Sequence, residues 1–231
     1  MSVNWTRRNF FGTAGAASLA FAQGPDAGAA SQTKTVKIIG ISCSPRKDRT
    51  TAAALRVCLE AAKGSGPDIE IELIDLGGLK INGDLAAGIP LAAGERDDFP
   101  QIGAKLRAPN VGGIIIGTPV YFSNMSSLCK AFLDRWMTFR GTFALRNKIG
   151  GAVAVGAARN GGQELTLQTI HAAMLCQDMI IVSEGRPTSR LGGILVSAQD
   201  DISKDEAGLA TARSLGRRVA EVALLLRKAG V

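Results

Sequence analysis

Residues 37–55 read KIIGISCSPRKDRTTAAAL, and this stretch passes from an apolar strand through a polar loop into a helix. The branched residues Ile38, Ile39 and Ile41 indicate the strand, and apolar residues at helical spacing after Thr51 indicate the helix. The first N–H groups of a helix have no partner within the helix, and they lie at the positive end of its dipole. The stretch therefore predicts an anion site of the kind that holds a phosphate.

The loop also supplies polar side chains for a phosphate. Its hydroxyls belong to Ser42, Ser44, Thr50 and Thr51, and Arg46 adds a cation that can make a charge-assisted contact. Neither G-x-G-x-x-G nor G-x-x-x-x-G-K-[ST] occurs near it, which favours a mononucleotide over the two commonest nucleotide motifs. Taken alone, the stretch has a simpler reading as a turn followed by a helix cap.

A second strand-to-loop segment, residues 114–136, offers a surface for a planar ring. Pro119 stiffens the exit from the apolar strand, and Tyr121 gives a flat aromatic face that can stack on a heterocycle. The alternative is that Tyr121 and Phe122 simply cover the end of the sheet.

A third segment, residues 150–174, combines a strand of small and branched residues with Gly161 and Gly162 before the next helix. Paired glycines let backbone amides approach a ligand closely. The three segments together therefore make a bound mononucleotide more probable than any of them does alone.

The three segments resemble the NADPH-dependent FMN reductase family of flavodoxin-like proteins, especially its iron–sulfur-flavoprotein-like branch. The resemblance is one of pattern and spans about residues 35–186. It implies an FMN cofactor, with NADPH or NADH as a co-substrate, and a homo-oligomer, either a dimer or a tetramer, in which a neighbour completes each active site.

The resemblance also implies which residues hold the FMN. The phosphate would be bound by Ser42, Ser44, Pro45, Arg46, Thr50 and Thr51. The loop beside the isoalloxazine ring would be Pro119, Val120, Tyr121, Phe122 and Ser123. The loop at the other edge of the ring would contribute Arg159, Gly161 and Gly162. Backbone amides near Tyr121 and at the glycine pair would stabilise negative charge on the reduced ring. No catalytic side chain is expected, because the flavin carries the electrons.

The cysteines depart from the iron–sulfur branch, whose members carry a compact cysteine cluster after the second strand. Residues 76–90 contain no cysteine, and Cys43, Cys58, Cys129 and Cys176 are widely spaced without a C-x-x-C pair. We therefore expect no cluster, no other metal site and four free thiols, of which the three on helices should face the core. Cys43 stands where the family often has glycine, so its side chain would border the phosphate.

The whole chain predicts an α/β fold with five strand–helix units. The expected strands are residues 35–41, 69–75, 111–118, 149–156 and 179–184, and the expected helices are residues 51–63, 97–107, 125–139, 163–177 and 203–228. Continuous apolar strands are typical of a parallel sheet covered on both faces. We expect a flavodoxin-like doubly wound three-layer sandwich, with a five-stranded parallel sheet in the order 2-1-3-4-5. In that order the loops at 42–50 and 118–124 meet at the carboxyl ends of the strands. Residues 77–95 and 187–198 are long enough to form a flap or a dimer contact, or are mere insertions.

The beginning of the chain looks like a twin-arginine export signal. Arg7 and Arg8 precede a weakly apolar run that ends at Ala22 and is shorter than the roughly 20 residues needed to span a bilayer. We expect a signal peptide at residues 1–22, a linker at 23–34 and one FMN-binding domain at 35–231, with no stable membrane span. The twin-arginine translocase would carry the folded protein to the periplasm or another extracytoplasmic space. The alternative is a tail in which two arginines occur by chance.

Charge and the remaining polar residues add no further function. The 27 Lys and Arg against 20 Asp and Glu give +7, but the basic residues of the last helix lack interleaved aromatics, so we expect no nucleic-acid binding. The single histidine, His171, and the Lys130, Asp134 and Arg135 group have the spacing of structural helix residues.

These observations favour a flavoprotein oxidoreductase that reduces flavin, a quinone or a similar small acceptor with NAD(P)H. Nicotinamide cofactors are scarce outside the cytoplasm, so an exported electron carrier between protein partners is an alternative. A flavin-free binding protein with the same fold is a third possibility.

Overall fold

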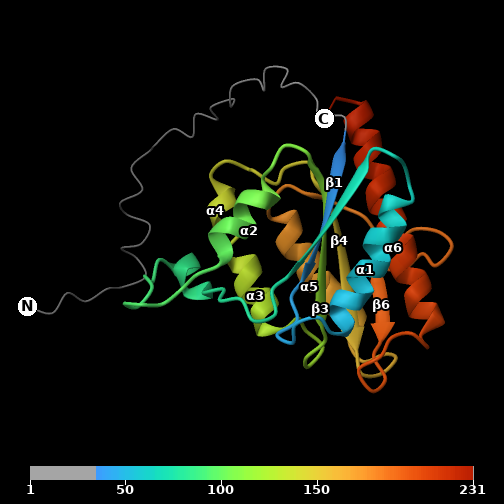
Figure 1. Cartoon of the computed structure of the whole chain (residues 1–231), viewed down its shortest axis with the longest axis horizontal. Helices are drawn as coiled ribbons and strands as arrows, with labels where there is room; N and C mark the ends of the chain where they lie inside the picture. The colour runs from blue at the N-terminus through green and yellow to red at the C-terminus, as the bar shows by residue number, and fades with distance from the viewer. Residues whose placement is uncertain (1–34, 231) are drawn as a thin grey trace, which may run out of the picture. The chain divides into compact units, whose positions relative to one another are not determined.

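The computed structural model describes residues 35–230, so the predicted signal peptide and linker lie outside the described residues. The elements, shown in Figure 1, are β1 (Val36–Ser42), α1 (Thr50–Lys63), β2 (Ile69–Asp75), a short 3₁₀ helix (Gly83–Ala87), α2 (Phe99–Leu106), β3 (Val111–Pro119), α3 (Ser127–Asp134), α4 (Met137–Arg140), β4 (Ile149–Gly156), α5 (Gln163–Leu175), β5 (Ile180–Ile181), β6 (Gly193–Val196) and α6 (Glu206–Lys228). None of the helices formed by the described residues has the length and apolar composition that crossing a membrane requires.

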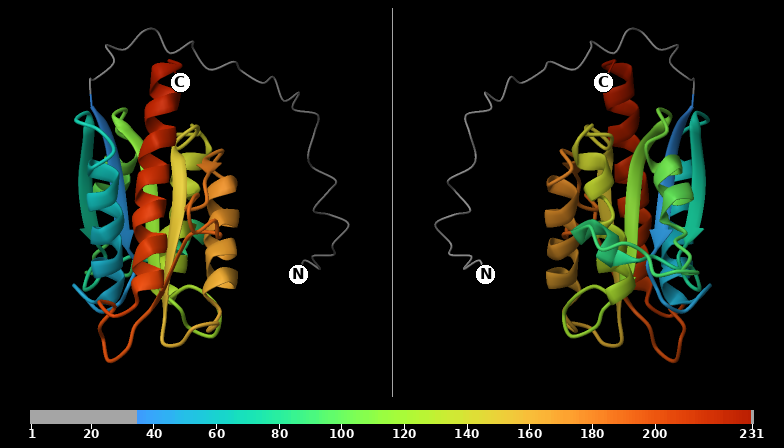
Figure 2. Two further views of the ribbon diagram at one scale, coloured as in Figure 1. Left: turned by 90° about the vertical axis from the view of Figure 1, so that its right-hand side faces the viewer. Right: turned by 90° about the vertical axis from the view of Figure 1, so that its left-hand side faces the viewer.

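The strands form a parallel sheet in the order β2-β1-β3-β4-β5, which confirms the predicted topology. Strand β1 lies at the centre of the winding, with Ile39 opposite Glu72 of β2 on one side and Ile114 of β3 on the other. Helices α1 and α6 cover one face of the sheet, and α2, α3 and α5 cover the other (Figure 2). Since all strands run the same way, the loops that follow β1, β3 and β4 emerge at one edge.

The sheet of the described residues differs from the prediction in having six strands. The position beside β4 is shared by two short strands, because β5 pairs with Ile149 and Gly150 while β6 pairs further along, with Val153 opposite Gly193. The sequence predicts one strand at residues 179–184 and treats residues 187–198 as a flap, a contact or an insertion. Part of that segment is instead β6, whose four apolar residues are too few for a periodic pattern to reveal.

The predicted helix at residues 125–139 is also two helices, α3 and α4. The N–H of Trp136 donates to the carbonyl of Leu133 at 3.0 Å and that of Phe139 to Trp136 at 2.9 Å, so the chain tightens to i→i+3 bonding here. The tighter turn brings Phe132, Trp136 and Phe139 into one buried cluster, with ring centroids 5.9 Å apart for the first pair and 6.4 Å for the second. Aromatic packing therefore outweighs helix continuity.

Helices α1 and α6 touch along their backbones on the other face. A Cβ at Gly216 would lie 1.9 Å from the carbonyl oxygen of Cys58, a distance that no side chain permits. Glycine at this position lets α6 pack directly on α1, and α1 is the helix whose first turn borders the loop after β1.

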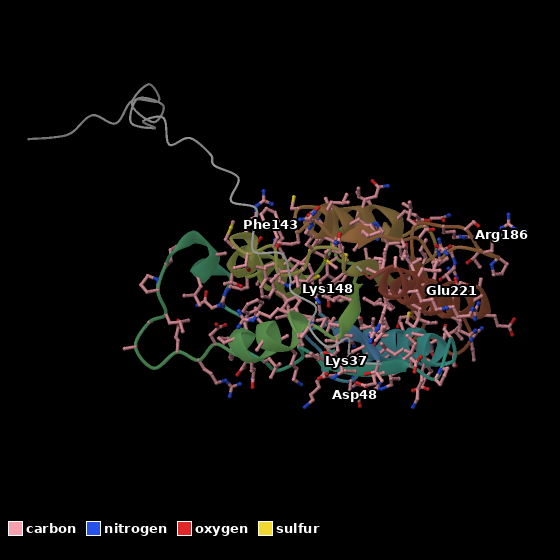
Figure 3. All side chains as sticks on the ribbon, turned by 90° about the horizontal axis from the view of Figure 1, so that it is seen from above. Lys37, Asp48, Phe143, Lys148, Arg186 and Glu221 are labelled. Atoms are coloured by element: carbon pink, nitrogen blue, oxygen red, sulfur yellow. The ribbon has the colours of Figure 1, made fainter. Side chains whose placement is uncertain are left out.

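Lys148 is buried at the amino end of β4 (Figure 3). Its ammonium donates to the carbonyls of Val111 at 2.7 Å and Ala108 at 3.2 Å, and desolvation lowers its pKa to about 8. A lysine in the unfolded chain has a pKa of about 10.4, so between the two values the unfolded state binds more protons. The free energy of unfolding should therefore rise with pH across this window.

We predict that Lys148→Met removes this pH dependence. Relative to the variant, the parent should gain about 2 to 3 kcal/mol of stability between about pH 7 and about pH 10, measured by urea unfolding. The exposed Lys63 is the control, because Lys63→Met should keep the pH profile of the parent. Identical profiles for the parent and Lys148→Met would contradict the prediction.

Candidate functional site

The predicted site residues lie on three loops at the carboxyl edge of the sheet. The end of β1, the loop after it and the first turn of α1 carry Ser42, Ser44, Pro45, Arg46, Thr50 and Thr51. The end of β3 and the loop after it carry Pro119, Val120, Tyr121, Phe122 and Ser123. The loop after β4 carries Arg159, Gly161 and Gly162.

Ser126 joins the first two loops. Its hydroxyl donates to the carbonyl of Cys43 at 2.7 Å and accepts the N–H of Cys129 at 3.1 Å, which caps helix α3. Its own N–H donates to Oγ1 of Thr118 at 3.0 Å, and all four residues are buried. The loops after β1 and β3 are therefore fixed side by side. Ser126 was not among the predicted site residues, although a serine before an apolar helix is a capping signal.

The third loop is packed against the second. The N–H of Val120 donates to the carbonyl of Val155 at 2.9 Å, which ties the end of β3 to the end of β4. Gly162 has φ +97, and a Cβ there would lie 2.4 Å from Oγ of Ser123 and 2.6 Å from its Cα. Glycine is therefore required at position 162 both by the backbone conformation and by the contact between the loops.

The loop after β1 fits a phosphate. Helix α1 begins at Thr50 without a side-chain cap from Arg49 and without an acidic residue in its first turn. Its leading N–H groups are therefore left for an external anion, which the helix dipole also favours. Oγ of Ser42 is buried and has no hydrogen-bond partner among the described residues, while Ser44 is buried and accepts the N–H of Arg46 at 3.2 Å.

The end of strand β2 supports this loop from below. The carboxylate of Asp75 accepts the N–H of Asp48 at 2.6 Å and that of Gly77 at 3.1 Å. A Cβ at Gly77 would lie 2.5 Å from Cα of Lys47, so the two backbone segments approach each other as closely as glycine allows. Asp75 and Gly77 were not among the predicted residues, and an aspartate two residues before Gly-Gly at the end of a strand is the turn signal that could have found them.

Both predicted arginines contact a fourth loop, which leads from β6 to α6 and is absent from the predicted site. Arg46 forms a double salt bridge with Asp200, with nitrogen–oxygen distances of 2.8 and 2.7 Å. The hydrogen bond from Arg46 holds the pKa of the Asp200 carboxyl below its usual value and raises the pKa of Arg46. Arg159 forms a salt bridge with Asp205 through a single contact, from Nη2 to Oδ1.

Asp205 fixes the end of this fourth loop through backbone hydrogen bonds. Its carboxylate caps α6 by accepting the N–H of Gly208 at 3.0 Å, and it also accepts the N–H of Val196 at 2.6 Å. The aspartate side chain is only 8% exposed, against 42% for its partner Arg159. Arg159 therefore orients the fourth loop relative to the third in this structure.

The turn after β3 exposes the ring of Phe122 to solvent. The N–H groups of Tyr121 and Asn124 donate to each other's carbonyls at 2.9 and 3.0 Å, and the two residues between them have left-handed backbones, Phe122 at φ +48 and Ser123 at φ +59. Phe122 is fully exposed, so it does not cover the end of the sheet as the alternative reading supposed. A bulky residue in this conformation is strained, and such strain concentrates at functional sites.

Two of the amides expected to face the flavin ring donate to acceptors within the protein. The N–H of Tyr121 is used in the turn, and the N–H of Gly161 donates to Oε1 of Gln163 at 2.8 Å. Gln163 is buried and also donates from Nε2 to the carbonyl of Ala158 at 2.7 Å. Gln163 therefore shapes the third loop, a role that nothing in the sequence pattern indicated.

The cysteines do not form a metal site. All four are free thiols, and Cys43, Cys58 and Cys129 are buried, whereas Cys176 is exposed at the end of α5, which contradicts its expected core-facing position. Burial raises the pKa of the Cys43 thiol, and this side chain lies in the core rather than beside the phosphate loop. Among residues 35–230 no group of three or more His, Cys, Asp or Glu side chains could hold a metal ion. An iron–sulfur cluster does not fit these residues.

A buried ion pair anchors the segment between β2 and α2. Arg135, which directly follows α3, lies 2.7 Å from Asp97, with the two side chains 8% and 6% exposed. The same guanidinium donates to the carbonyl of Asn82 at 3.1 Å and lies 4.6 Å from the ring centre of Phe99. Arg135 thus has the packing role that the sequence suggested, and its partner is this segment.

The other residues read as structural behave in that way. His171 is half-buried on α5, where burial lowers its pKa, and its Nε2 has no partner among the described residues. Lys130 and Asp134 form an exposed ion pair along α3, an interaction that contributes little to stability.

Comparison with known proteins identifies the family. The family model of the NADPH-dependent FMN reductases matches residues 36–190. The chain belongs to this family. It is 43% identical over 197 residues to an iron–sulfur flavoprotein of Methanocaldococcus jannaschii, covering 84% of this chain and 100% of that protein.

A further relative agrees with this assignment, and a solved structure agrees with the fold. An NAD(P)H dehydrogenase (quinone) of Paracoccus denitrificans is 34% identical over 163 residues, or 60% of this chain and 76% of that protein. The solved structure of a flavodoxin, a WrbA-like protein from Agrobacterium tumefaciens, shares the fold with a TM-score of 0.56 at 21% identity, covering 83% of this chain and 99% of that one. The predicted family and the flavodoxin-like fold are therefore confirmed, and the predicted cofactor, FMN, is the one in the family's name.

We predict that Phe122→Gly makes the protein more stable and weakens its binding of FMN. Glycine relieves the left-handed strain, worth about 1 kcal/mol, and no buried contact is lost because the ring is exposed. Loss of the ring should raise the Kd for FMN several-fold. Flavin fluorescence measures the Kd, and urea unfolding measures the stability.

Phe143 provides a matched control for this variant. It has the same φ of +48 and is half exposed, but it lies in the loop that leads into β4, at the amino edge of the sheet. Phe143→Gly should leave the Kd for FMN unchanged. An unchanged Kd in Phe122→Gly as well would show that this ring has no part in the site.

Proposed function

We propose that this protein is an FMN-dependent oxidoreductase that takes electrons from NADPH or NADH and passes them to a quinone or a similar small acceptor. The observation that carries the proposal is the uncapped start of α1 at Thr50, bordered by the unpartnered hydroxyl of Ser42. Membership of the FMN reductase family supports the same reading.

The residues of the loop after β1 would bind the phosphate of FMN. The N–H groups of the first turn of α1 would donate to its oxygens, and the hydroxyls of Ser42, Ser44, Thr50 and Thr51 would add further donors. Arg46 would supply the positive charge that a dianionic phosphate needs.

The loops after β3 and β4 would hold the isoalloxazine ring. Bound FMN supplies the electron-transfer chemistry of the family, and the protein supplies binding and orientation. Tyr121 and Phe122 present aromatic faces at this edge, and the contact of Gly162 with Ser123 fixes the spacing of the two loops. A flat, apolar acceptor such as a quinone suits a site bordered by an exposed aromatic ring. The relative from Paracoccus denitrificans, an NAD(P)H dehydrogenase (quinone), supports this choice of acceptor.

We also propose that the protein acts outside the cytoplasm as a homo-oligomer. Export would use the twin-arginine translocase, and this part of the proposal depends on Arg7 and Arg8 and the weakly apolar run that follows them. Folding before export suits a protein that must acquire FMN in the cytoplasm.

The reaction is tested by mixing the full-length, FMN-loaded protein with NADPH or NADH without oxygen. We expect the visible absorbance of the flavin to bleach within the mixing experiment and to return on addition of a quinone. Bleaching that a quinone fails to reverse would reject this acceptor class. A flavin that neither nucleotide bleaches would reject the reductase assignment.

A further inference from the structure

We propose that Asp200 stands in for the phosphate of FMN: its carboxylate holds Arg46 when the cofactor is absent and competes with the phosphate for it. The inference depends on the proposed function, since it assumes that Arg46 is a phosphate ligand. It assigns to the loop between β6 and α6 a part in setting how tightly this protein binds phosphorylated flavin.

The geometry of the pair is that of an arginine bound to an oxyanion. Nη1 of Arg46 lies 2.8 Å from Oδ2 of Asp200, and Nη2 lies 2.7 Å from Oδ1. Two parallel N–H···O contacts are also how a guanidinium binds two oxygens of a phosphate. The carboxylate therefore occupies the donors that the phosphate would use.

Asp200 is held in place independently of Arg46. Ala198 and Asp201 exchange two backbone hydrogen bonds, both 2.9 Å, around a tight turn whose central residues, Gln199 and Asp200, have φ of +51 and +61. This is the pattern of a two-residue hairpin turn with left-handed central residues. Asp201 braces the same turn by accepting the N–H of Ser203 at 2.9 Å.

Arg46 is the part of the pair that can move. Its backbone is fixed by the bond from its N–H to the buried Ser44, but its side chain is 53% exposed and belongs to a loop whose next residues are also exposed. An exposed ion pair is weak, whereas a contact between arginine and a dianionic phosphate is stronger. Arg46 can therefore turn from Asp200 to the phosphate when FMN binds.

Competition of this kind means that Asp200 lowers the affinity for FMN. It leaves the affinity for a flavin without a phosphate unchanged. Breaking the pair is part of the free energy of binding FMN, but riboflavin has no group that needs Arg46. The effect of removing Asp200 should thus be seen with FMN alone and should require Arg46.

The test is a fluorescence titration of the full-length apoprotein with FMN and with riboflavin near physiological salt. Asp200→Asn should bind FMN roughly two- to fivefold more tightly than the parent, the range expected from an exposed ion pair, with no change for riboflavin. Arg46→Ala should weaken FMN binding by roughly tenfold or more and leave riboflavin unchanged. In the double variant, Asp200→Asn should have no further effect.

Asp178 is the matched control. It is an exposed aspartate paired with Arg146 at 3.1 Å, in the loop that leads into β5 at the opposite edge of the sheet. Asp178→Asn changes the net charge by the same amount and should leave the Kd for FMN unaltered.

The outcomes separate this inference from the proposed function. If Asp200→Asn weakens FMN binding or leaves it unchanged, Asp200 does not compete with the phosphate, and the inference fails while Arg46 stays a phosphate ligand. If the effect persists without Arg46, it is general charge repulsion, and the inference also fails. If Arg46→Ala binds FMN as tightly as the parent, the phosphate assignment in the proposed function is wrong.

Discussion

The candidate site depends on one buried hydroxyl, that of Ser126. This hydroxyl caps α3 by accepting the N–H of Cys129, and it donates to the carbonyl of Cys43. The N–H of Ser126 donates to Oγ1 of Thr118. A buried polar group without its partners costs free energy, so these three bonds are maintained together. The end of β1, the end of β3 and the start of α3 therefore form one rigid junction, and the loops that would bind phosphate and ring have a fixed separation before any cofactor arrives.

The sequence was sufficient for the order of the five predicted strands and for the position of the loops, because continuous apolar strands and glycine- or serine-rich strand exits are local patterns. It was insufficient for the ion pairs that connect the loops to one another. Arg46 and Asp200 are 154 residues apart in the chain and Arg159 and Asp205 are 46 apart, so only tertiary structure brings these charges together. The break between α3 and α4 was hidden for a related reason. The residues on both sides of it keep helical spacing, and only the packing of the buried aromatic residues shows the change to i→i+3 bonding.

The segment between β2 and α2 is fixed by the buried pair of Arg135 and Asp97. It has no cysteine between residues 76 and 90, and the ion pair ties it to the end of α3. An ion pair that is almost fully buried is costly unless its hydrogen bonds are satisfied, and here the guanidinium also binds the carbonyl of Asn82. The segment is thus held in place by protein contacts.

The most direct test of this account is a crystal structure of the full-length protein grown with FMN. We expect the phosphorus atom at the amino end of α1, with its oxygens within hydrogen-bond distance of the N–H groups of Thr50 and Thr51 and of the hydroxyl of Ser42. FMN bound elsewhere, or bound with its phosphate pointing away from α1, would contradict the claim that the loop after β1 is a phosphate site.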